Sequence, residues 1–177
     1  MKNPFLLSCL LLVLTCNAIA QDCDGVKEKK DPFTNKTEKS ARVIIGNLKI
    51  KWSVDVNQSD GETSMKWAIA MQGEFNQKFD VGTKLLLKLE DGTVLNLKTS
   101  EPSSPVTQAV NGGAGTINVF TTYSLKFVLS KESLTQLARS PIVDLKFDIP
   151  GQEIKNPKIK NNQMGKLQSV FTCLLNS

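Results

Sequence analysis

The sequence predicts a mainly β protein: an antiparallel β-sandwich or partly open barrel of about seven strands, with two helices. Three observations support this class. Apolar and polar residues alternate over several segments, turn-forming residues separate these segments, and the period changes to a helical one near the end of the chain. The helices are expected at about residues 131–139 and 161–175.

The first expected hairpin organises the rest of the chain. Residues 48–56 are apolar at every even position, and residues 65–71 are apolar at every odd position. Turn formers fill residues 57–61 between them, so the two segments are expected to pair as antiparallel strands. One hairpin cannot bury its own apolar face, so other strands must supply a second layer.

Further strands are expected at residues 41–45, 84–90, 117–129 and 142–149, with a short one at 153–155. The hairpin after 84–90 has two alternatives. A two-residue loop would mix its faces, whereas a three-residue loop over 90–92 pairs Leu87 with Leu95 and Leu85 with Leu97. The three-residue loop places the leucines on one face of the hairpin. It requires a positive φ at residue 92, and Gly92 adopts a positive φ without steric cost, so this loop is preferred.

Both expected helices have one apolar side. Ser130 stands at an N-cap position, Leu134, Leu137 and Ala138 have helical spacing, and Pro141 prevents continuation. Near the C-terminus five apolar residues recur at steps of three and four. They are Met164, Leu167, Val170, Phe171 and Leu174.

The N-terminus predicts export. Residues 1–20 have a lysine followed by an apolar run and Ala18-Ile19-Ala20, which is typical of a signal peptide cleaved after Ala20. The alternative, lipidation at Cys16, has a poorer processing signal. We expect an extended arm over residues 21–40, held by Cys23 and by Phe33 tucking into the body, and a single β-rich domain over residues 41–177.

Cleavage would leave two cysteines, Cys23 and Cys173, one near each end of the mature chain. In an exported protein the simplest outcome is one disulfide, and two free thiols are the alternative. Closing so long a loop stabilises a fold by about 4–5 kcal/mol in the chain-entropy model.

Composition restricts the chemistry. The chain contains no histidine, which removes the commonest general base and the usual zinc and copper ligands. The formal net charge of +5 is modest, so nucleic acid is not an expected partner. Residues 55–66 resemble a calcium loop, but Lys66 stands where a bidentate glutamate is needed. We therefore expect no metal and no cofactor.

Trp52 and Trp67 fall on the apolar side of the first hairpin, where they are expected to pack in the core. If that face were open, they would instead form a platform for sugars. Lys49, Lys51 and Lys66 fall on the opposite side and are expected to form a solvated face.

The stretch from Ser100 to Gly115 is the candidate binding loop. It is rich in proline and glycine, and Glu101 is its only ionisable residue. This composition suits shape recognition of a protein or glycan, and a disordered insertion without a partner is the alternative. The candidate residues are Glu101, Gln108, Asn111, Gly112 and Gly113.

Several segments together resemble a group of small secreted, uncharacterised proteins of Bacteroidota. They are Cys23, Asp31-Pro-Phe-Thr-Asn-Lys, the hairpin over residues 82–97, the helix before Ser140-Pro-Ile, and the terminal helix with Cys173. Asn35 stands where this pattern has glycine. The resemblance implies one domain and an envelope location, and it implies no activity.

We therefore expect an exported, non-enzymatic binding or structural module of the bacterial periplasm or cell surface. Its partner would be an envelope protein or a glycan, and the mature chain would have no transmembrane segment. The alternative is a glycan-processing hydrolase that uses paired carboxylates, for which Glu101 and Asp80 are the candidates.

Overall fold

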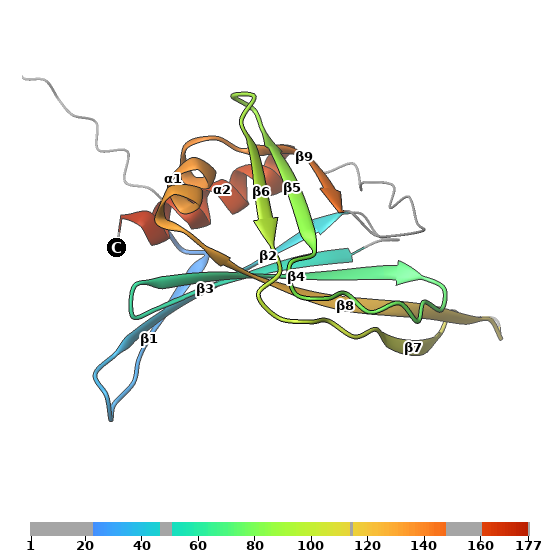
Figure 1. Ribbon diagram of the computed structural model, residues 1–177. Helices are drawn as coiled ribbons and strands as arrows, with labels where there is room; N and C mark the ends of the chain where they lie inside the picture. Colours follow the sequence, from blue (N-terminus) through green and yellow to red (C-terminus); the bar gives the residue numbers. More distant parts are fainter. Residues whose placement is uncertain (1–22, 47–50, 114, 148–160, 177) are drawn as a thin grey trace, which may run out of the picture.

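The computed structural model describes residues 23–46, 51–113, 115–147 and 161–176, which form a sandwich-like, mainly β fold and not a closed barrel (Figure 1). This part of the chain contains nine strands in two antiparallel sheets and two helices, so the predicted class is confirmed. The strands are β1 (Val26–Lys30), β2 (Thr37–Gly46), β3 (Lys51–Ser59), β4 (Glu62–Gln72), β5 (Lys84–Leu89), β6 (Val94–Lys98), β7 (Val106–Asn111), β8 (Ile117–Leu129) and β9 (Ile142–Phe147). The helices are α1 (Lys131–Arg139) and α2 (Asn161–Leu175).

The larger sheet has six strands in the order β1-β2-β3-β4-β8-β7. Its central hairpin is the predicted one, because β3 pairs with β4 over Ser53 to Ser59. The turn is shorter than residues 57–61: β3 continues through Ser59, and only Asp60 and Gly61 connect the strands. Both have positive φ (52° and 79°), as a two-residue type I′ hairpin requires.

The smaller sheet has the order β6-β5-β9 and crosses the larger one steeply (Figure 1). Leu85 pairs with Leu97 and Leu87 with Leu95, which confirms the three-residue loop. Gly92 has a φ of 89°, and its N–H donates to the carbonyl of Leu89 at 3.0 Å. The leucines therefore point together into the core.

The core lies between one face of the large sheet and the inner face of the small one. Trp52 and Trp67, from β3 and β4, are 2% and 0% exposed, which confirms their predicted core position. Both rings meet Phe147 of β9 edge-on, with centroids 5.7 and 6.0 Å away, and they lie 6.4 Å from each other. This aromatic cluster joins the two sheets.

The two helices complete the layer that holds the small sheet (Figure 1). Ser130 caps α1 as predicted, accepting the N–H of Ser133 at 3.1 Å. In α2 the predicted apolar side is buried against α1, β2 and β9. The amide of Gln163 exchanges two hydrogen bonds with the backbone of Gly46, at 3.2 and 3.1 Å, and so fixes α2 to the end of β2.

The predicted disulfide is present. Cys23, just before β1, is bonded to Cys173 near the end of α2, with Cα atoms 5.9 Å apart. The bond spans 150 residues and links the first edge of the large sheet to the helical layer.

The N-terminal segment differs from the expected arm. Residues 26–30 and 37–40 belong to β1 and β2, so the segment is part of the large sheet. Phe33 does not tuck into the body, because it lies at the tip of the β1–β2 hairpin with 94% of its surface exposed. Asn35 has a φ of 58°, a left-handed conformation that asparagine tolerates better than most residues.

Two strands depart from a regular alternation of buried and exposed residues. In β9 the alternation is broken: Ile142 is buried and Val143 is half exposed, because the pairing with β5 shifts register between Lys88 and Leu89. At the start of β8, Ile117 is exposed because that end of the strand extends beyond the small sheet (Figure 1). The signal peptide, the short strand at 153–155 and Lys49 lie outside the described residues.

Candidate binding face

The outer face of the large sheet is its open face. Figure 1 shows the small sheet and both helices together on the other side of the large sheet. Along β2, β3, β4 and β8, residues that alternate with the core residues point to the open face. The side chains at these alternating positions therefore determine what this face can bind.

A row of charged residues crosses the open face. Arg42 lies opposite Asp55, Asp55 opposite Lys66, and Lys66 opposite Lys126, so β2, β3, β4 and β8 each contribute one residue. The guanidinium of Arg42 donates two hydrogen bonds to the Asp55 carboxylate, with Nη2 3.2 Å from Oδ2. These bonds and the negative charge of Asp55 raise the pKa of Arg42 above its usual value.

The pairing leaves an excess of positive charge. The ammonium of Lys126 lies 3.5 Å from the carboxylate of Glu101. Lys66, between Asp55 and Lys126, has no ion-pair partner among the described residues. The exposed Lys66 is thus a cation available to a ligand in the middle of the row.

Small side chains beside the charged row leave a depression in the open face. The next cross-strand row is Ile44, Ser53, Ala68 and Ser124. Ile44 is 59% exposed, and its neighbours are too short to fill the space above the sheet. Ile44, Ser53 and Ala68 line part of a hollow of about 250 Å³ that continues to Ala70 and Thr122.

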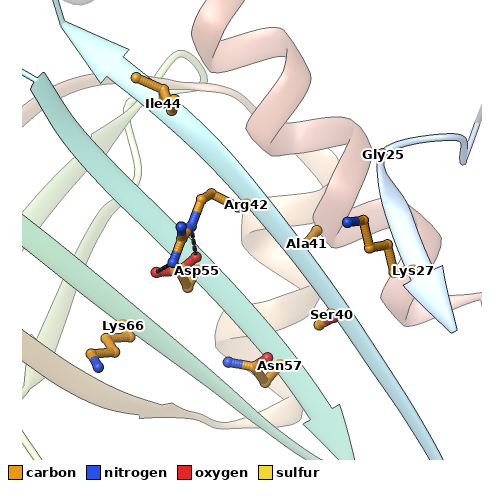
Figure 2. A pocket seen from close by; sticks show the side chains of 9 residues that line it. All are labelled: Gly25, Lys27, Ser40, Ala41, Arg42, Ile44, Asp55, Asn57 and Lys66. Atoms are coloured by element: carbon orange, nitrogen blue, oxygen red, sulfur yellow. Dashed lines mark hydrogen bonds and ion pairs between the residues drawn. The ribbon is translucent and has the colours of Figure 1, made fainter. Parts of the chain in front are cut away.

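A larger groove of about 640 Å³ lies toward β1, as Figure 2 shows. Arg42 and Asp55 are bonded to each other on its floor, Lys66 stands on one side and Lys27 of β1 on the other (Figure 2). Hydroxyl and amide groups add polar contacts. The lining residues are Gly25, Lys27, Ser40, Ala41, Arg42, Ile44, Asp55, Asn57 and Lys66. Three cations and one carboxylate give this groove a net positive charge.

Sequence reasoning missed this groove. Lys66 was expected on a solvated face, and it is exposed there. The missing information was the register of distant strands, which brings Lys126 beside Lys66 and Lys27 near Arg42. The only signal in the sequence is that charged residues occupy the polar positions of three separate alternating segments.

The candidate binding loop contains an edge strand. Residues 106–111 form β7, which pairs with β8 from Ile117 to Thr122, so the expectation that the whole stretch from Ser100 to Gly115 is a loop is wrong. Gln108 and Asn111 lie on β7, and Gly112 and Gly113 begin the turn to β8. All four are exposed at the projecting end of the sheet. That these residues bind a partner stays a prediction.

The carboxylates of the hydrolase alternative lie elsewhere. Glu101 lies beside Lys126, whereas the backbone carbonyl of Asp80 accepts the hydroxyls of Thr83 and Thr99 at 2.8 and 2.9 Å in a turn. Neither residue lines the groove of Figure 2. No group of three or more metal-ligating residues occurs in the part of the chain that the structure describes.

Comparison with known proteins gives no relative: no family model, no curated protein and no solved structure matches this chain. Within the described residues, no helix is long and apolar enough to cross a membrane.

Proposed function

We propose that this chain is an exported, non-enzymatic binding module of the bacterial periplasm or cell surface, and that its groove holds an extended acidic segment of an envelope protein. The observation that carries the proposal is the pair of cations Lys27 and Lys66. Both line the groove, and neither has an ion-pair partner among the described residues. A ligand with carboxylates would supply the charge that the groove lacks.

The shape of the face supports an extended ligand. The charged row runs across the strands, and the small side chains of Ser53 and Ala68 lie beside it, so a chain can approach the sheet closely there. Ile44 offers an exposed apolar contact at the edge of both hollows. An acidic peptide with alternate apolar side chains would use both features.

A protein partner fits better than a glycan. Sugar recognition commonly uses an exposed aromatic ring as a stacking surface, and no aromatic residue lines the groove. Trp52 and Trp67, which would have formed such a platform, are buried in the core.

The location is supported by two features of the chain. The first twenty residues have the pattern of a signal peptide. The disulfide between Cys23 and Cys173 is of a kind that persists in oxidising compartments such as the periplasm. The resemblance to secreted proteins of Bacteroidota points to the same place.

The proposal is tested with a fluorescent peptide of alternating Glu and Val residues, measured by anisotropy against the mature protein. We expect binding that weakens as NaCl rises from about 50 to 500 mM, because exposed charges are screened. A peptide of alternating Lys and Val should not bind.

Two double variants separate the groove from general charge. Lys27→Gln with Lys66→Gln should weaken binding of the acidic peptide by about tenfold or more. Lys84→Gln with Lys98→Gln makes the same change of net charge on exposed positions of the small sheet, and it should leave binding unchanged. Equal losses in both double variants, or no binding by the wild type, would contradict the proposal.

A further inference from the structure

The two edges of the large sheet differ in a way that indicates different roles. The strand β1 at one edge reads Val-Lys-Glu-Lys-Lys, with four charged residues of five. The strand β7 at the other edge reads Val-Thr-Gln-Ala-Val-Asn, with no charge and every residue exposed. Charged residues on an edge strand prevent it from pairing with another chain, so β1 is protected and β7 is not.

The backbone of β7 has one side available. The N–H of Gly112 donates to the carbonyl of Thr116 on the β8 side, at 2.8 Å. Hydrogen-bonding direction alternates along an antiparallel strand, so Val110, Gln108 and Val106 also bond toward β8. The N–H and C=O groups of Thr107 and Ala109 therefore point away from the sheet.

We propose that β7 pairs antiparallel with β7 of a second copy of this chain, about a two-fold axis that passes beside Gln108. In this register Thr107 lies opposite Ala109 of the second copy, so the outward N–H and C=O groups of both copies form hydrogen bonds. The two six-stranded sheets join into one continuous sheet, and the two-fold symmetry closes the assembly at two copies.

The side chains favour a second copy as the occupant. Around Gln108 the strand is nearly symmetric, so Val106 of each copy lies opposite Val110 of the other and on the same face. These valines are 55% and 50% exposed in the single chain, and pairing covers them. From Pro102 through Leu125 the chain has no Asp, Glu, Lys or Arg, so two copies meet here without charge repulsion.

Sedimentation equilibrium of the mature, disulfide-bonded protein tests this assembly. The pairing surface is narrow, so we expect a reversible dimer with a dissociation constant between about 1 μM and 1 mM. Gln108→Lys and Gln108→Glu place like charges opposite each other, and each variant alone should be monomeric. An equimolar mixture of the two should dimerise again, because opposite charges then meet at the axis.

Two further variants make the test specific. Ala109→Pro removes one outward N–H and should shift the equilibrium to monomer, while a thermal unfolding curve checks that the fold is kept. Asn96→Lys adds the same charge as Gln108→Lys at an exposed position of β6, and it should dimerise like the wild type. A wild-type protein that is monomeric at about 1 mM, a ladder of larger species, or dimers that survive Gln108→Lys would overturn the proposal.

Discussion

Replacing Trp52 by alanine should cost about 3–5 kcal/mol of unfolding free energy, the usual range for truncating a buried large aromatic residue. The side chain is 2% exposed and contacts Trp67 and Phe147 edge-on, at centroid distances of 6.4 and 5.7 Å. Each aromatic pair contributes about 0.5–1.5 kcal/mol beyond the burial of area, which favours the upper half of the range.

The buried indole N–H of Trp52 partly offsets this loss of stability. The indole Nε1 of Trp52 is buried without a hydrogen-bond partner in the described part of the chain, and an unsatisfied buried donor costs about 1–3 kcal/mol. Trp52→Phe removes that donor and keeps a ring in the cluster. It should therefore cost much less than Trp52→Ala, about 1 kcal/mol, although it leaves a smaller void.

Urea unfolding followed by far-UV circular dichroism measures both variants. The chain has two tryptophans, so in either variant the fluorescence of Trp67 reports on the remaining cluster. A loss below about 1 kcal/mol for Trp52→Ala, which is the range of surface substitutions, would refute the reasoning and place the ring at an exposed site.

Three other perturbations follow from the fold. Replacing both disulfide cysteines by serine should lower the free energy of unfolding by about 5 kcal/mol, because the bond closes a loop of 150 residues. The loss should appear as a lower midpoint of urea unfolding. An unchanged midpoint would mean that the bond does not constrain the unfolded chain. Gly92→Ala should lower the free energy of unfolding by about 1–2 kcal/mol, because Gly92 has a φ of 89°. Gly165→Ala should raise it by up to about 1 kcal/mol, because Gly165 lies in α2 with open space at its Cβ position. Calorimetry that shows the same sign of stability change for both variants would be inconsistent with these conformations. Backbone N–H groups lower the pKa of Asp31 and Asp91 from 3.8 in the fold, so their stabilisation is present above about pH 4 and is lost as the pH falls through the lowered values. Replacing both by asparagine should flatten the acid limb of a stability–pH profile, and an equally steep limb would exclude their contribution.

Local patterns in the sequence were sufficient for the parts of the fold that local physics determines. The alternation around Trp52, the three-residue loop at Gly92 and the cap at Ser130 follow from side-chain direction, φ and hydrogen bonding within a few residues. The pairing of Cys23 with Cys173 followed because only two cysteines remain after the predicted cleavage.

The elements that the sequence does not predict depend on tertiary contacts. Edge strands such as β1 and β7 bury little, so they lack the apolar alternation by which β3 was recognised. Proline and glycine flank β7 and predict a loop there, whereas the strand forms through its tertiary pairing with β8. A deletion of residues 103–113 would therefore remove a strand and expose an edge of β8, so we expect it to destabilise the fold.

Predicting the groove requires both the local alternation within a strand and the order of the strands in the sheet. That Lys66 is exposed follows from the alternation of β4 alone. That it shares a groove with Lys27 and Arg42 depends on the order of β1, β2, β3 and β4 in the sheet. The sequence does not fix this order before the strands are placed.

We propose that the open face of the large sheet binds acidic chains, and amide chemical-shift mapping by NMR tests this binding most directly. The mature protein is titrated with the peptide of alternating Glu and Val residues. We predict that the largest shifts fall on residues 25–27, 40–44, 53–57, 64–68 and 126, which carry the groove and the charged row. Shifts confined to the small sheet or the helices, or no shifts at all, would contradict the claim.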